Sequence, residues 1–183
     1  MKVSRSQVDE NRRTILDAAG RLFRARGFDE VSVAEVMQAA GLTHGAFYGY
    51  FGSKDELIAA TLAELMRADR APGKWTQSLA RYLSPAHRDD AAGGCPVAAL
   101  ATETAREPQP ARAAMTQGVE RMIARRAVDA PGADEAERRR TAVGAVATMV
   151  GALILARAVD DPQLSIELLE AARARLADAT IDG

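Results

Sequence analysis

The chain has 183 residues, of which 48% are hydrophobic and 4% aromatic, and its formal net charge is -1. This length suits one sizeable core or a small module joined to a larger body, and the near-zero charge excludes a chain that is a polycation over its whole surface. One cysteine excludes an intrachain disulfide, and we expect a cytoplasmic protein because no charged, apolar and small-residue leader opens the chain.

Positive charge is concentrated near the N-terminus. Residues 1–28 carry seven Lys and Arg against three acids, a local balance of +4, so the remainder carries -5. A nucleic-acid surface would therefore be local. Such a cluster is commonly a solvated helix face, and we expect one or two of its members to reach phosphate.

The first predicted helix ends at Gly27, where glycine enters the left-handed conformation cheaply. Its apolar residues recur at the spacing of one helical face, namely Ile15, Ala18, Ala19, Leu22 and Phe23. Ser32 and Glu35 form a capping box that opens a second, short helix, and Gly41 stops it. Thr43 can cap a third helix that runs to about Tyr50, which predicts a helix-turn-helix.

A second capping box, Ser53 to Glu56, opens a fourth helix over 54–70, which Pro72-Gly73 breaks. Further helices are expected around 75–83, from Pro96 onward, and from about 108 to 129, with a polar loop over 84–94. The two most apolar helices follow, at about 134–159 and 163–178. The expected fold is all-α with about nine helices: a helix-turn-helix domain over 1–53, then a helical regulatory and dimerisation domain over 54–183, connected by the helix at 54–70.

Residues 33–57, VAEVMQAAGLTHGAFYGYFGSKDEL, closely resemble the DNA-binding signature of the tetracycline-repressor (TetR) family. Residues 15–23, ILDAAGRLF, and the pair Gly27-Phe28 resemble its first helix, so the resemblance is strong over about 10–60. The C-terminal part looks like one subgroup through Gly94-Cys95-Pro96 and the segments 103–110 and 151–157. The resemblance implies a bacterial transcriptional regulator, most commonly a repressor, that binds a palindromic operator on double-stranded DNA as a homodimer and is released by a small-molecule or thiol-reactive effector.

A recognition helix needs small or hydrogen-bonding residues on its exposed side and apolar anchors, here Phe47 and Phe51, on its inner side. By similarity, the expected DNA-binding residues are Ser32, Val33, Thr43, His44, Gly45, Tyr48, Tyr50 and Lys54. Two alternatives stay open at this point: Tyr48 packs against the first helix, or His44 is an ordinary surface residue. At Gly49 the family often carries a larger side chain, so one contact is missing here.

The last two helices carry more apolar residues than one monomer needs, which predicts a dimer interface. Its expected residues are Val143, Val146, Val150, Leu153, Ile154, Leu164, Leu168 and Leu169, with part of this surface serving as intramolecular core. The uncharged stretch 141–156 is shorter than the roughly 20 apolar residues of a membrane span, so no membrane partner is expected. A ligand pocket is expected among the middle helices, lined by Trp75, Leu79, Tyr82, Cys95, Leu100, Met115, Met122 and Met149, although methionines are commonly core filler.

Catalytic and metal-binding patterns are missing from the sequence. The two histidines, His44 and His87, stand in no metal-ligand spacing, and no nucleophile elbow, phosphate loop or dinucleotide fingerprint is present, so we expect no metal, no cofactor and no enzyme activity. Cys95 precedes Pro96 at a predicted helix start, which favours its thiolate and suggests an oxidation or electrophile sensor. For Cys95 itself, the alternative is a small buried cap without a redox role. For the whole protein, the alternatives are a thiol-dependent enzyme that uses Cys95 with His87 and a helical adaptor that binds protein.

Overall fold

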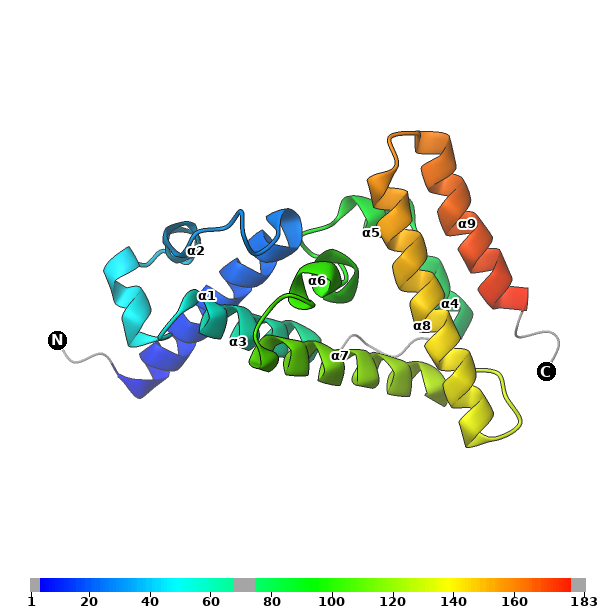
Figure 1. Cartoon of the computed structure of the whole chain (residues 1–183), viewed down its shortest axis with the longest axis horizontal. Coiled ribbons are helices and arrows are strands. Elements are labelled where there is room, and N and C mark those ends of the chain that lie inside the picture. The colour runs from blue at the N-terminus through cyan, green and yellow to red at the C-terminus, as the bar shows by residue number, and fades with distance from the viewer. Residues whose placement is uncertain (1–3, 68–74, 179–183) are drawn as a thin grey trace.

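The computed structural model describes residues 4–67 and 75–178, and the regular secondary structure of this part is all helical, which confirms the all-α prediction (Figure 1). In chain order the elements are α1 (Arg5–Arg26), α2 (Val33–Ala39), the 3-10 helix η1 (His44–Gly49), α3 (Lys54–Arg67), α4 (Trp75–Tyr82), α5 (Pro85–Asp89), α6 (Pro96–Thr104), α7 (Gln109–Val128), α8 (Glu135–Ala158) and α9 (Pro162–Asp178). The predicted fourth helix reaches Arg67 in α3; its last residues and the break at Pro72-Gly73 lie outside the described part.

The two ends of α1 are set by local sequence. The Ser4 side chain accepts a hydrogen bond from the backbone N–H of Gln7, and Gly27 ends the helix with a φ of 85°. The predicted apolar face is confirmed for Ile15, which is fully buried, and for Phe23. The Phe23 ring meets the Phe28 ring edge to face, with centroids 5.2 Å apart. The helix and the turn after it therefore share one core.

The helix-turn-helix is formed by α2 and η1. The capping box at the start of α2 is confirmed, with Ser32 and Glu35 bonded reciprocally. Gly41, at a φ of 71°, makes the turn between the two elements. The second element is a six-residue 3-10 helix, a tighter form than the α-helix, and it contains two residues of low helix propensity, Gly45 and Gly49. The predicted cap at Thr43 is wrong, because its side chain makes no capping hydrogen bond.

The larger body is built on α7, which packs along α3 on one side and against α8 on the other, while α9 pairs with α8 (Figure 1). The elements α1, α2 and η1 lie at one end of the molecule and α8 and α9 at the opposite end. Between them, α6 contacts α1, α3, α7 and α8. This position makes α6 a bridge between the two ends.

The predicted polar loop over 84–94 contains a helix that the sequence analysis missed. Ser84 caps α5 by accepting a hydrogen bond from the N–H of His87 at 3.2 Å, and Pro85 occupies the first turn. The Arg157 guanidinium, on α8, donates to the carbonyls of His87 at 2.8 Å and Arg88 at 2.9 Å. These contacts hold the short helix against the body, which a helix of five residues requires.

Candidate functional site

The leading edge of η1 is slender and open to solvent. Thr43, His44 and Gly45 are exposed, and a Cβ built at Gly45 or Gly49 would meet no atom within 4 Å. The Tyr48 side chain is 71% exposed, which contradicts the alternative that it packs against the first helix. Thr43, His44, Gly45 and Tyr48 thus offer hydroxyl, imidazole and backbone groups to the solvent.

Phe47 and Phe51 hold this edge in place. They are 1% and 2% exposed, which confirms the prediction that they face the core, and their rings stack with centroids 5.8 Å apart. The Arg12 guanidinium, on α1, lies over the Phe51 ring at 5.0 Å from its centroid, a cation–π contact. Phe51 therefore packs against α1 and, together with Phe47, anchors residues 43–51, which we call the recognition segment after the family resemblance.

Tyr50 lies near the end of the recognition segment and Lys54 follows it, and each is half-buried. The Tyr50 hydroxyl accepts a hydrogen bond of 2.8 Å from the Asn11 side-chain amide on α1, so its own proton remains for an outside acceptor. Asn11 was not among the predicted site residues. Lys54 opens α3, where the Ser53 hydroxyl accepts the N–H of Glu56. The Glu56 carboxylate accepts the N–H of Gly52, so this capping box closes one residue earlier than predicted.

The start of α2 holds Ser32 in an internal network. Its hydroxyl donates to the Glu35 carboxylate at 2.8 Å, and the Arg26 guanidinium pairs with the same carboxylate at 2.7 Å. The hydrogen bonds from the Ser32 backbone and from Arg26 lower the pKa of Glu35 from 4.5 to about 2. Val33 follows, half-buried, as the first residue of the helix.

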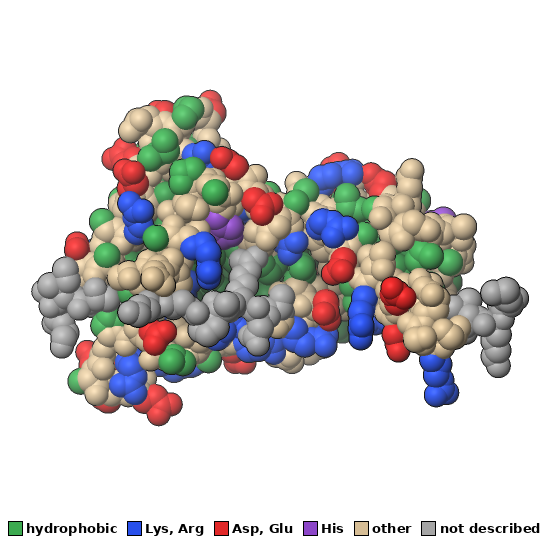
Figure 2. All heavy atoms as spheres, turned by 180° about the vertical axis from the view of Figure 1, so that it is seen from behind, with side chains coloured by type: hydrophobic (Ala, Val, Ile, Leu, Met, Phe, Trp, Pro, Cys, Tyr) green, Lys and Arg blue, Asp and Glu red, His purple; other side chains and the backbone are tan. Residues whose placement is uncertain are grey.

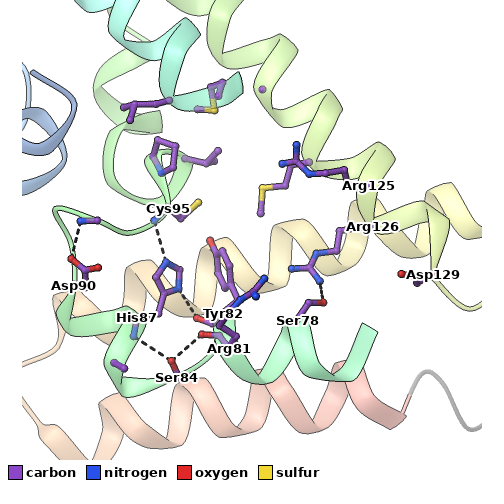
Figure 3. Close-up of a pocket in the computed structure, with 18 residues that line it drawn as sticks. Ser78, Arg81, Tyr82, Ser84, His87, Asp90, Cys95, Arg125, Arg126 and Asp129 are labelled. Atoms are coloured by element: carbon purple, nitrogen blue, oxygen red, sulfur yellow. Dashed lines mark hydrogen bonds between the residues drawn. The ribbon is translucent and has the colours of Figure 1, made fainter. Parts of the chain in front are cut away.

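A pocket of about 580 Å³ opens in the larger helical body, bounded by α3, α4, the segment from α5 to α6, and α7 (Figure 3). Three of the predicted pocket residues line it: Tyr82, Cys95 and Met122. The other five belong to the packed core, namely Trp75, Leu79, Leu100, Met115 and Met149. Helical spacing identifies a buried face, but it does not tell which part of that face borders an empty volume.

Polar and charged residues that the sequence analysis did not single out also line this pocket, including Ser78, Arg81, Arg125 and Arg126. Arg126 is half-buried, and one of its guanidinium nitrogens donates to the Ser78 hydroxyl (Figure 3). The sequence feature that could have indicated a charged pocket wall is the pair Arg125-Arg126 inside an otherwise apolar stretch of α7. An arginine pair of this kind also occurs on solvated helix faces, so the signal does not discriminate.

Cys95 and His87 meet at one end of the pocket. Cys95 is 3% exposed, and its backbone N–H donates to His87 Nε2 at 3.1 Å, while His87 Nδ1 bonds the Tyr82 carbonyl at 2.7 Å (Figure 3). Each imidazole nitrogen therefore serves a backbone group and fixes the loop between α5 and α6. This arrangement does not support a Cys95 and His87 catalytic pair.

One carboxylate joins the larger body to the end of the molecule formed by α1, α2 and η1. Glu103, near the end of α6, accepts the backbone N–H of Phe28 at 2.6 Å. A Cβ at Gly27 would lie 2.6 Å from the same carboxylate, so glycine is needed there for space as well as for its positive φ. The Arg24 side chain adds a second tie, because it donates to the carbonyl of Ala92 at 2.5 Å.

The surface of α8 and α9 divides into core and open face. Val146, Leu153 and Leu169 are buried, whereas Val143 and Leu164 are 44% and 40% exposed. The remaining predicted interface residues, Val150, Ile154 and Leu168, are half-buried. A Cβ at Gly144 or Gly151 would meet nothing within 4 Å, so the backbone of α8 is accessible to a close neighbour.

Among the described helices, α8 is long and apolar enough, by length and composition, to cross a membrane. Core helices of soluble proteins meet the same test. Its contacts with α6, α7 and α9 place α8 within the helical body.

Comparisons with known proteins cover both parts of the chain. The profile of the family described as bacterial regulatory proteins, tetR family, matches residues 15–61. A second profile, described as the C-terminal domain of LmrA/YxaF-like transcriptional regulators, matches residues 70–173, more than half of the chain.

Individual relatives agree over the N-terminal part. The regulator TtgR of Pseudomonas putida is 37% identical over 62 residues, which are 34% of this chain and 30% of that protein. The repressor Rv1474c of Mycobacterium tuberculosis is 40% identical over 63 residues, 34% of each chain. The matches thus span about a third of these relatives' length.

Solved structures extend the likeness to the whole fold. The reduced form of Escherichia coli NemR superposes with a TM-score of 0.71 at 24% identity, over 92% of this chain and 96% of that one. A TetR-family regulator from Cytophaga hutchinsonii gives a TM-score of 0.71 at 18% identity, over 97% and 98%. With both profiles matched, the chain belongs to the TetR family of bacterial transcriptional regulators.

Proposed function

We propose that this protein is a cytoplasmic repressor that binds a palindromic operator as a homodimer and leaves it when a small molecule or a thiol-reactive compound binds. The observation that carries the proposal is the exposed edge from Thr43 to Tyr48, mounted on the buried rings of Phe47 and Phe51. An open polar edge on a rigid apolar anchor is what insertion into a major groove requires.

The DNA contacts divide into base-reading and phosphate-binding groups. Thr43 and His44 are the base-reading candidates, and Gly45 lets the backbone approach the groove. Tyr48, Tyr50 and Lys54 surround that edge and suit phosphate oxygens, with the N-terminus of α3 adding its dipole beside Lys54. Ser32 and Val33, at the start of α2, would lie near the same DNA backbone.

Dimerisation would use the open faces of α8 and α9. Val143, Val150 and Ile154 follow one another along one side of α8 at helical spacing, and Leu164 is exposed on α9. A two-fold pair places two recognition segments about 34–36 Å apart, one turn of duplex. The operator symmetry follows from the protein symmetry.

Effector release would act through α3. This helix carries Lys54 at one end and presents Leu65 and Met66 to the pocket at the other. A ligand that fills the pocket therefore contacts the helix that positions the DNA-binding end. The ligand must bind the DNA-incompetent arrangement more tightly, since otherwise it shifts no equilibrium.

A thiol-reactive effector would reach Cys95 through the pocket. The residue lines the pocket and begins α6, the helix that carries Glu103 to the turn at Phe28. A group attached to the sulfur would displace α6. The displacement would reach the DNA-binding end through the hydrogen bond between Glu103 and Phe28.

The test is a mobility-shift assay on the region upstream of the protein's own gene. Thr43→Ala removes one base-reading hydroxyl, and we expect operator affinity to fall roughly tenfold, the value of about 1–3 kcal/mol for a base contact. Tyr48→Phe should weaken operator and random DNA alike, because a phosphate contact carries no sequence information. Thr116→Ala, at an exposed position of α7, is the matched control. Equal binding by wild type and Thr43→Ala would contradict the assignment.

A further inference from the structure

The pocket wall formed by α4 and α7 is basic. Arg81, Arg125 and Arg126 line it. Figure 2 shows the hollow between the two ends of the molecule, with both basic and acidic side chains around it. Two acids also line the pocket. Asp90 is engaged in the loop, where it accepts the N–H of Gly93 at 2.8 Å, and Asp129 follows the end of α7.

In the described part of the chain, Arg126 is paired with no acid. Among the described residues, no carboxylate lies within ion-pair distance of its guanidinium, and its hydrogen bond goes to the neutral hydroxyl of Ser78. That hydroxyl in turn donates to the carbonyl of Trp75 at 2.9 Å, so it stabilises the guanidinium as a dipole alone. Burial, assisted by the positive charges of Arg81 and Arg125, lowers the pKa of Arg126. A half-buried arginine without a counterion is unfavourable for folding, and such sites are commonly functional.

Apolar side chains line the rest of the pocket. Leu65 and Met66 face the pocket from α3, Val97 from α6 and Met122 from α7. A volume of about 580 Å³ holds a single small organic molecule. The pocket therefore combines a cationic wall with apolar side chains, two of which belong to α3, the helix that begins at Lys54.

We propose that the effector of this protein is an amphipathic organic anion whose carboxylate pairs with Arg126 and whose apolar body lies against α3. The inference rests on the proposed regulatory function and names the ligand class of that same pocket. The carboxylate supplies the counterion that Arg126 lacks, in the bidentate geometry that a guanidinium favours. The apolar body of the ligand contacts Leu65 and Met66 on α3. Ligand binding can therefore displace α3, whose other end carries Lys54.

The experiment compares 2-naphthoate with its neutral analogue 2-naphthamide, by calorimetric titration of the full chain without DNA. We expect wild type to bind the carboxylate at least about tenfold more tightly, because charge-assisted hydrogen bonds are roughly twice as strong as neutral ones. Arg126→Met should remove this preference. Arg112→Met, an exposed arginine of α7 outside the pocket, should retain it.

A second readout is independent of the ligand. Arg126→Met removes a charge without a counterion and keeps the side-chain volume similar, so the melting temperature of the ligand-free protein should rise, whereas Arg112→Met should leave it unchanged. Arg126→Lys, which keeps the charge, should retain part of the carboxylate preference and serves if the methionine variant does not fold. Equal binding of the two probes by wild type, or a preference that survives Arg126→Met, would overturn the proposal. Operator binding without ligand, measured on the same variants, tests the regulatory function separately.

Discussion

The DNA-binding hypothesis depends on the directions of a few side chains in and beside η1. The inward direction of Phe47 and Phe51 was predictable because helical spacing decides which side chains a short helix buries. The bond from Asn11 to the Tyr50 hydroxyl was not, because it joins residues 39 positions apart and depends on how α1 crosses the recognition segment. Local rules act over one or two turns, and this pair lies far beyond them.

Protonation of Glu35 at low pH should destabilise the DNA-binding end of the molecule. Its pKa is lowered to about 2, so its contribution to folding is complete above about pH 4.5 and fades as pH falls toward 2. Glu35→Gln should lower the melting temperature near neutral pH, and the gap to wild type should narrow in acid. Thermal unfolding followed by circular dichroism across this range measures the gap. Glu120→Gln, an exposed residue of α7, is the control, and a gap that does not depend on pH would contradict the assignment.

At the scale of elements, the ends of helices were more predictable than their packing. Gly27, the Ser32 capping box and Gly41 set boundaries that the structure confirms, because caps act within a few residues. The segment 84–94 was predicted as a loop, although Ser84-Pro85 is a cap followed by a first-turn proline. Its helix depends on Arg157 from α8, a contact that the local sequence does not contain.

The hydrogen bond between Glu103 of α6 and Phe28, in the turn between α1 and α2, should stabilise that turn. Glu103→Ala leaves the N–H of Phe28 without its acceptor, and an unsatisfied buried donor costs about 1–3 kcal/mol. We expect faster hydrogen exchange at the Phe28 amide and a lower melting temperature. Glu120→Ala removes a carboxylate of α7 and should change neither quantity. Unchanged protection at Phe28 would show that Glu103 does not hold this turn.

At the scale of the whole molecule, the sequence indicated an apolar excess in the last two helices without separating core from open surface. The structure buries Val146 and Leu153 and leaves Val143 exposed, so α8 presents one face to the body and one to solvent. The pocket was equally hard to predict, because its basic wall and its empty volume arise where four segments meet. Tertiary arrangement, rather than local propensity, decides both features.

Dimerisation gives the third prediction. Ala147 is exposed on the same side of α8 as Val143 and Val150, so Ala147→Glu would place two carboxylates in the proposed interface. We expect sedimentation to show a shift from dimer to monomer, with a loss of operator binding. Ala124→Glu makes the same change at an exposed position of α7 and should remain dimeric. A dimer that persists in Ala147→Glu would place the interface elsewhere.

The central claim is that two recognition segments read one symmetric site. Selection of bound duplexes from a random pool by the purified protein measures this directly, at a salt concentration where non-specific binding is weak. We expect enrichment of a palindrome whose half-sites lie about one helical turn apart, and loss of that enrichment in Thr43→Ala. Recovery of an asymmetric site, or of no preferred sequence, would contradict it.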